Sequence, residues 1–106
     1  MYAIIDIGSN TVRMNVYKVT KHVLKLKNTT KETIGLAAYL EHGSLTEEGL
    51  DVAISTVKKF LEQLKGSNVK KTYLIATATI RKAQNKDRFF EALKRYKNLD
   101  IHGLSG

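Results

Sequence analysis

The first part of the chain has the alternating hydrophobic pattern of β-strands. Residues 2–7 form a short apolar run, which predicts a strand that is buried on both faces. Residues 11–20 and 23–30 alternate between apolar and polar positions, as strands do when one face lies on a core. Because only Lys21 and His22 separate these two runs, we expect them to form an antiparallel hairpin. The pattern therefore predicts a meander of three strands.

A long amphipathic helix is predicted after an irregular segment. Residues 31–45 lack a clear period, and we expect a loop with one helical turn there. Thr46 is a suitable N-cap, because the two glutamates that follow it oppose the positive end of the helix dipole. Ser44 with Glu47 is an alternative capping box, and Gly66 is a natural end for the helix. The apolar stripe at helical spacing consists of Leu50, Ala53, Ile54, Val57, Leu61 and Leu64.

The last third of the chain predicts two more strands, each reached through a helix. Residues 72–76 and 99–102 are short apolar runs typical of strands. Residues 80–84 and 87–97 have helical character, and Asn85 is expected to cap the second of these helices. The order β-β-β-α-β-α-β predicts an α/β fold with a five-stranded mixed sheet, in which three antiparallel strands precede two strands reached by right-handed crossovers. We expect the whole chain to form a single domain.

Charge and composition narrow the classes of partner. The net charge is +8, from 18 basic and 10 acidic residues, and such an excess attracts phosphate chains, nucleotides, nucleic acid or acidic proteins. The chain has no cysteine, which excludes a disulfide framework and a thiolate metal site and agrees with a reducing compartment. It shows neither a signal-peptide pattern nor an apolar run of the ~20 residues that cross a bilayer. We therefore expect a cytoplasmic protein with no membrane partner.

Polar chemistry is concentrated in residues 6–13, between the first two predicted strands. Gly8, Ser9 and Asn10 form a tight turn, and the N–H dipoles of such a turn converge on a point that suits a phosphate. Gly8 also permits an unusual φ and lets a ligand come close to the backbone. Asp6 stands beside the turn, where a carboxylate can hold a divalent cation or a water. The alternative is an ordinary hairpin turn that Asp6 caps, since Gly-Ser-Asn is common turn chemistry.

The predicted topology brings a second polar group near this turn. If the first and fourth strands are parallel, their carboxyl ends meet at one edge of the sheet, where ligands of such folds bind. The turn then lies near Thr77, Thr79 and Arg81. Arg81 at that place can hold a phosphate oxygen through two N–H donors, or it can be an ordinary arginine on a helix surface.

Three stretches along the chain also carry a resemblance to a known family. They are residues 6–13 (DIGSNTVR), 43–49 (GSLTEEG) and 76–85 (ATATIRKAQN). In this order they resemble the first phosphate loop, the entry to the first long helix, and the segment after the fourth strand of the exopolyphosphatase / guanosine pentaphosphate phosphatase family. That family belongs to the actin-like ATPase superfamily. Residues 104–106 are similar to the opening of a further family motif, SGEEEA.

The resemblance implies a fold, a reaction and a set of site residues. The fold is the ribonuclease-H-like (actin-like ATPase) half-domain, truncated at the C-terminus. The reaction is hydrolysis of a phosphoanhydride in inorganic polyphosphate or guanosine pentaphosphate, helped by Mg²⁺. Asp6 is implied as a catalytic residue and metal ligand. The implied contacts to substrate phosphates are Gly8, Ser9, Asn10, Thr11, Arg13 and Arg81.

The same resemblance implies that this chain holds half a site. The family's second phosphate loop and the glutamate that activates water both lie beyond residue 106, so the chain alone is expected to be inactive. The family also commonly has an LGEG-like stretch where this sequence has IGLAA at residues 34–38, which leaves the substrate preference open.

Two other functions are compatible with the sequence. A non-catalytic module that binds polyanions or nucleic acid would use the charge excess, although nucleic acid is not the expected partner. A sugar-kinase-like ATPase would share the superfamily fold. Because truncation would leave one face of the sheet short of helices, we also expect exposed apolar surface or a homodimer.

Overall fold

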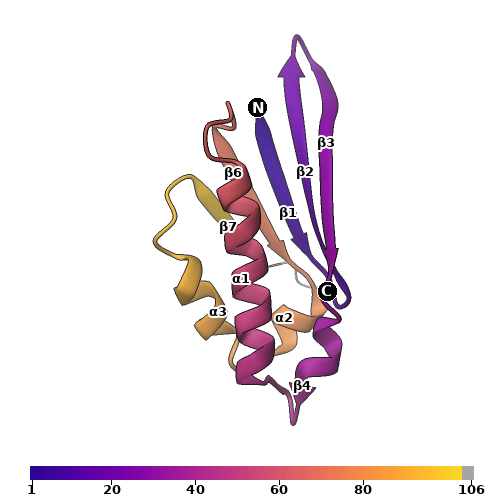
Figure 1. The fold of residues 1–106 in the computed structure, drawn as a ribbon, viewed down its shortest axis with the longest axis vertical. Helices are drawn as coiled ribbons and strands as arrows, with labels where there is room; N and C mark the ends of the chain where they lie inside the picture. The colour runs from indigo at the N-terminus through magenta and orange to yellow at the C-terminus, as the bar shows by residue number, and fades with distance from the viewer. Residues whose placement is uncertain (104–106) are drawn as a thin grey trace.

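The computed structural model describes residues 1–103, which form a five-stranded mixed sheet with helices on one side (Figure 1). The strands of this sheet are β1 (Tyr2–Ile7), β2 (Thr11–Thr20), β3 (Val23–Thr33), β6 (Lys71–Ala76) and β7 (Leu99–Gly103). They lie in the order β3-β2-β1-β6-β7. The pairs β1–β2 and β2–β3 are antiparallel, whereas β1–β6 and β6–β7 are parallel. The predicted fold class and strand directions are confirmed.

The long helix α1 (Glu47–Gln63) is capped as predicted. The Thr46 side chain accepts a hydrogen bond from the Gly49 N–H at 3.0 Å. Gly66, just beyond the helix, has a φ of +80°, the left-handed conformation that commonly ends helices. In the buried stripe Leu50, Ala53 and Val57 are fully enclosed, together with Phe60, which the prediction left out. No helix among residues 1–103 is both long and apolar enough to span a membrane.

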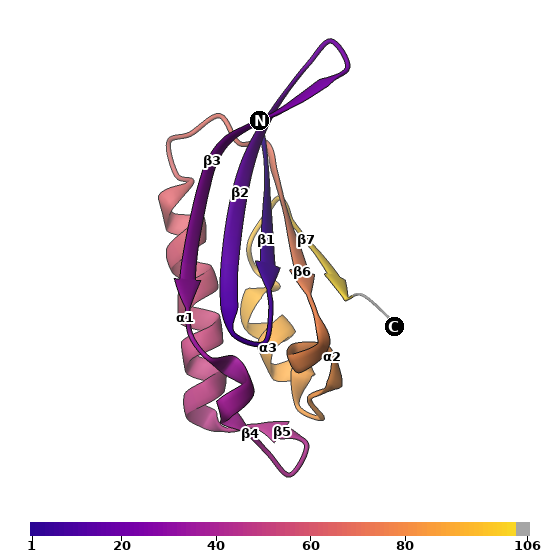
Figure 2. The ribbon, with the colours of Figure 1, turned by 90° about the vertical axis from the view of Figure 1, so that its right-hand side faces the viewer.

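Within residues 1–103, helices cover only one face of the sheet. Helix α1 and helix α3 (Lys86–Leu93) lie on the same side of the strands in both views (Figures 1 and 2). Ala3, Ile5 and Ile7 of β1 point into this layer and are at most 1% exposed, whereas Asp6 is exposed. The prediction that β1 is buried on both faces is therefore wrong. We call the other side, which carries Asp6, the open face.

The β2–β3 hairpin extends beyond the other strands (Figures 1 and 2). Its outer part exposes Val19, Val23, Leu24 and Leu26, each by more than half of its surface. The predicted exposed apolar surface is thus present, and a homodimer stays a prediction. Strand β3 also runs further than expected, to Thr33, because its last residue pairs with the first residue of β2.

The irregular segment before α1 contains more structure than the pattern indicated. The predicted helical turn is the 3₁₀ helix η1 (Leu36–Tyr39). It is followed by a small hairpin, β4 (Leu40–Glu41) with β5 (Ser44–Leu45), which was not predicted. Ser44 lies in β5, so the alternative capping box is wrong. Helix α2 (Ala78–Lys82) begins and ends two residues earlier than predicted.

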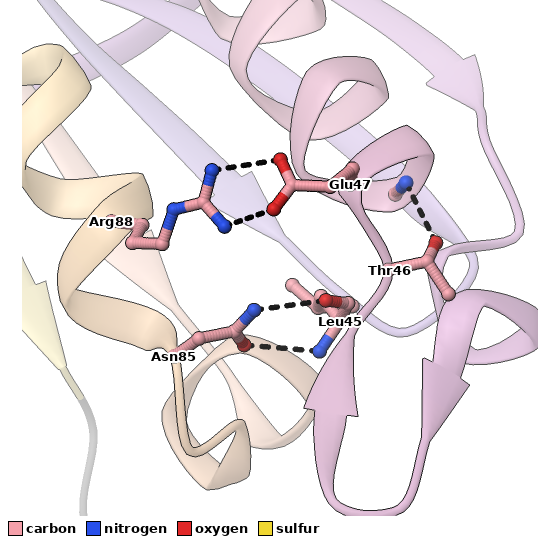
Figure 3. Close-up of polar contacts among 6 residues, drawn as sticks. Leu45, Thr46, Glu47, Asn85 and Arg88 are labelled. Atoms are coloured by element: carbon pink, nitrogen blue, oxygen red, sulfur yellow. Dashed lines mark hydrogen bonds and ion pairs between the residues drawn. The ribbon is translucent and has the colours of Figure 1, made fainter.

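The side chain of Asn85 joins α3 to this hairpin instead of capping the helix (Figure 3). Its Oδ1 accepts from the Leu45 N–H at 3.0 Å, and its Nδ2 donates to the Leu45 carbonyl at 2.8 Å. Beside it, Arg88 donates to both carboxylate oxygens of Glu47, and this bidentate contact holds the pKa of Glu47 below its usual value. Asn85 is the N-cap residue of α3, as predicted, but its side chain makes no capping hydrogen bond because its amide is used by the backbone of β5.

We expect Asn85→Ala to lower the free energy of unfolding by about 1–3 kcal/mol, because it leaves two half-buried backbone groups of Leu45 without partners. Urea unfolding of the 106-residue chain measures the change. Asn68→Ala is the matched control, since Asn68 is exposed and its side chain makes no hydrogen bond among residues 1–103. Equal stability of the two variants would contradict the role assigned to Asn85.

Candidate functional site

The loop between β1 and β2 forms a polar hollow at the carboxyl end of β1, and we call it the loop hollow. Its volume is about 290 Å³. The residues that line it are Asp6, Gly8, Ser9, Asn10, Thr11 and Arg13. These are six of the seven residues selected from the sequence. The β1–β2 loop, η1 and α2 lie at the same end of the sheet in both views (Figures 1 and 2).

The segment around η1 anchors the loop from one side. The Ser9 carbonyl accepts from the Ala37 N–H at 2.8 Å. The Asn10 carbonyl accepts from two consecutive N–H groups, those of Ile34 at 2.8 Å and Gly35 at 2.9 Å. Gly35 has a φ of +60°, a backbone conformation that a glycine adopts without strain. Sequence reasoning missed these anchors, because backbone donors carry no residue signature.

The start of α2 anchors the loop from the other side. Thr77 donates to the Ile7 carbonyl twice, through its N–H at 3.1 Å and through its hydroxyl at 2.6 Å. Within the loop, the Gly8 N–H donates to the Thr11 carbonyl at 3.0 Å. The carbonyl oxygens of Ile7, Ser9, Asn10 and Thr11 are therefore all held by the protein.

The donors of the loop are left available. The backbone N–H groups of Ser9 and Asn10 donate to no acceptor within residues 1–103. The side chains of Ser9, Asn10 and Thr11 likewise form no hydrogen bond within that part of the chain. The alternative in which these side chains only stabilise their own turn is thus not what the structure shows. A loop whose backbone carbonyl oxygens are used and whose N–H groups are free favours an anion.

The role of Gly8 comes from its lack of a side chain and not from an unusual backbone angle. Among the described glycines, those with positive φ are Gly35, Gly43 and Gly66, so Gly8 does not use the left-handed freedom that its residue type permits. A Cβ atom at Gly8 would lie 3.3 Å from the Thr11 carbonyl oxygen, closer than an ordinary contact. The absence of a side chain therefore keeps the loop tight and its backbone accessible.

Asp6 and Arg13 face each other across the open face. They are direct partners in the β1–β2 register, and both are exposed. Neither side chain forms a hydrogen bond or ion pair with any residue from 1 to 103. The alternative role of Asp6 as a cap of its own turn is thus not seen. Two opposite charges lie beside the hollow without neutralising each other through a direct ion pair.

Of the second predicted polar group, which is Thr77, Thr79 and Arg81, one residue contacts the strand that leads into the loop. Thr77 contacts the end of β1 as described above, which confirms its predicted position. Thr79 is 6% exposed, and Arg81 is half-buried in the last turn of α2. The Arg81 N–H donates to the Thr77 carbonyl at 3.0 Å, but Arg81 does not line the loop hollow. Its contact with phosphate stays a prediction.

The side chains around the hollow could bind a metal ion only if a substrate supplied further ligands. Among residues 1–103 there is no group of three or more His, Cys, Asp or Glu side chains that could hold a metal ion. Asp6 is the acidic side chain that lines the hollow. Mg²⁺ commonly binds one or two protein carboxylates together with phosphate oxygens and waters, so this sparse donor set is compatible with it.

Comparison with known proteins places this geometry in a family. The Ppx/GppA phosphatase family matches residues 15–106. The chain belongs to this family. The guanosine-5'-triphosphate,3'-diphosphate pyrophosphatase of Vibrio parahaemolyticus is 32% identical over 107 aligned positions, which include all of this chain and 22% of that protein. The enzyme of the same name from Aeromonas hydrophila is 31% identical over the same shares.

Solved structures of this family have the same fold. A Ppx/GppA family member of Aquifex aeolicus aligns with a TM-score of 0.85 and 27% identity over 97% of this chain and 34% of its own. An exopolyphosphatase of Cytophaga hutchinsonii aligns with a TM-score of 0.88 and 26% identity over 99% of this chain and 34% of its own. The chain therefore has the actin-like fold of the Ppx/GppA proteins. The chain spans about a fifth of the length of the curated relatives and about a third of these structures.

Proposed function

We propose that this chain supplies the first phosphate-binding loop of a longer phosphoanhydride hydrolase, which acts on inorganic polyphosphate or guanosine pentaphosphate. The observation that carries the proposal is the hydrogen bonding of the loop hollow. Its carbonyl oxygens are held by the protein, whereas the N–H groups of Ser9 and Asn10 have no acceptor in the described structure. Membership of the Ppx/GppA phosphatase family supports the same class of substrate.

Each lining residue has a definite part in this proposal. The N–H groups of Ser9 and Asn10 donate to oxygens of one phosphate, and the nearby hydroxyl of Thr11 adds a further donor. Arg13 balances the charge of that phosphate from the open face. The anchors from η1 and Thr77 keep these donors in place, so that little reorganisation accompanies binding.

Asp6 is the residue that would hold Mg²⁺, together with phosphate oxygens of the substrate. When bound, the ion supplies positive charge to those oxygens and orients water. The contribution of the chain is to fix the Asp6 carboxylate beside the loop through the pairing of β1 with β2 on one side and with β6 on the other. Support for this role comes from the free carboxylate and from its place in the hollow.

Phosphate release with Mg²⁺ tests the proposal, with polyphosphate and guanosine pentaphosphate offered separately to the full-length protein that contains this chain. We expect release from at least one of the two. The 106-residue chain by itself should bind tripolyphosphate and release no phosphate.

Two outcomes would contradict the proposal. Consumption of ATP that requires an alcohol co-substrate would indicate a sugar-kinase-like ATPase. Retention of single-stranded nucleic acid with a steep salt dependence, and without phosphate release, would indicate a polyanion-binding module. Cytoplasmic location and a homodimer remain part of the proposal, and cell fractionation and sedimentation velocity test them.

A further inference from the structure

A second cation lies next to Arg13 on the open face, outside the loop hollow. Arg13 pairs with Lys31 in the β2–β3 register, just as it pairs with Asp6 in the β1–β2 register. Directly paired residues of neighbouring strands point to the same side of a sheet. Asp6, Arg13 and Lys31 therefore form one row across three strands. We call Arg13 and Lys31 the cationic pair.

The neighbours of Lys31 confirm the side to which it points. Glu32, the next residue, forms an ion pair with Lys59 of α1 at 3.0 Å, so Glu32 faces the helices. Its partner Val12 is fully buried, as expected on that side. Since successive side chains of a strand alternate, Lys31 faces the opposite side. It is exposed there and has no ion pair with any described residue.

A β-bulge sets this arrangement. The register of the hairpin shifts by one residue between Val16 and Tyr17. Without the shift, the pairing that starts at Thr20 and Val23 would place Thr30 opposite Arg13 and would turn Lys31 toward the helices. Bulges commonly occur next to functional sites, where they re-aim a side chain.

The cationic pair forms no ion pair with any described residue, although Asp6 lies opposite Arg13 in the same row. Residues 7–31 contain one arginine and five lysines and no acidic residue. Like charges directly opposite each other destabilise a sheet, so the pairing of Arg13 with Lys31 is a cost to the fold. An anion bound between the two side chains removes that cost.

We propose that Lys31, together with Arg13, binds the phosphate groups that follow the one held in the loop hollow. The inference rests on the proposed function. Lys31 is two strands away from Asp6, which is about 10 Å at the usual spacing of about 4.8 Å between strands. It is thus placed for a more distant group of the same anion. The cationic pair makes the site selective for chains of phosphates over a single phosphate.

Calorimetric binding to the 106-residue chain tests this inference, with orthophosphate and inorganic tripolyphosphate as probes. Tripolyphosphate represents both polyphosphate and the triphosphate end of a guanosine nucleotide. We expect Lys31→Gln to weaken tripolyphosphate binding by about three- to tenfold and to leave orthophosphate binding unchanged. Lys31→Arg should restore most of the affinity, because it keeps the charge.

Lys25→Gln is the matched control, since it removes the same charge from β3 at an exposed position opposite Lys18. An equal loss of tripolyphosphate affinity in the Lys25→Gln and Lys31→Gln variants would overturn the inference, because a general charge effect would then explain it. Loss of orthophosphate binding in Lys31→Gln would overturn it as well. If the unaltered chain binds neither probe, the proposed function itself fails.

Discussion

Asp6→Asn is expected to lower phosphate release by the full-length protein by at least about a hundredfold at saturating Mg²⁺. The substitution keeps the size of the side chain and removes the one carboxylate that lines the loop hollow. The Asp6 side chain is exposed and forms no hydrogen bond within residues 1–103, so the fold should not change. Release of phosphate at several Mg²⁺ concentrations, with thermal unfolding as the check on folding, measures the effect.

The same variant should have the opposite effect on binding without metal. A carboxylate beside a bound phosphate repels it, so Asp6→Asn should bind tripolyphosphate more tightly than the unaltered chain when Mg²⁺ is removed with a chelator. With Mg²⁺ present it should bind more weakly, because the ligand that links metal and loop is lost. Calorimetry in the two conditions shows whether the order of affinities reverses.

Asp100→Asn provides the control for both measurements. Asp100 lies on β7, and its ion pair with Lys71 holds its pKa below the usual value. It does not line the loop hollow. We expect this variant to keep its activity and its binding in both conditions. If Asp6→Asn behaves in the same way, Asp6 has no part in catalysis or metal binding.

Gly49→Ala is expected to destabilise the chain by about 1–3 kcal/mol, although alanine is the better helix former by about 1 kcal/mol. A Cβ atom at Gly49 would lie 2.5 Å from Cβ and 3.0 Å from Cγ of Tyr39. Gly49 is buried in the first turn of α1, and Tyr39 is the last residue of η1. The Cβ atom of Tyr39 is fixed by the backbone, so a change of the Tyr39 rotamer does not relieve this contact.

The displacement should also reach the loop hollow. η1 and the two residues before it supply the N–H groups that hold the Ser9 and Asn10 carbonyls. We therefore expect Gly49→Ala to weaken tripolyphosphate binding even under conditions where the chain is fully folded. Urea unfolding and calorimetry give the two effects separately, and Ser55→Ala, at an exposed position of α1, is the control. A gain in stability for Gly49→Ala would show that η1 moves away without cost.

Much of the fold is local in origin and was predictable for that reason. The alternation of apolar and polar residues along 11–20 and 23–30 follows from the two-residue repeat of a β-strand. The cap at Thr46 needs only its own side chain and an N–H group three residues away. The position of the glycine-serine-asparagine turn after a strand was also visible in the sequence. Six of the seven predicted site residues line the hollow, because four of them form one tight loop and Asp6 and Arg13 are paired on the strands beside it.

The errors concern groups whose partners are distant in the sequence. Asn85 was predicted to cap a helix, yet its amide binds Leu45, 40 residues away. Residues 2–7 show no clear polar alternation that would mark the open face, because Ile4, which shares that face with Asp6, is apolar and half-buried. Arg81 does not line the loop hollow, whereas Thr77 contacts the end of β1, so the predicted phosphate contact of Arg81 stays a prediction. The match at residues 104–106 lies outside the described part of the chain.

By itself, the sequence determined the strands, the capped helix and the cluster of small polar residues at the carboxyl end of β1. The tertiary structure alone decided which groups of that loop are used and which are free, because η1 and α2 supply the hydrogen bonds that occupy its carbonyls. It also decided that Lys31 shares a face with Arg13, since a single bulge in β3 shifts the register by one residue. Such a shift leaves no mark in the alternation of residue types, but it changes the face on which each side chain lies.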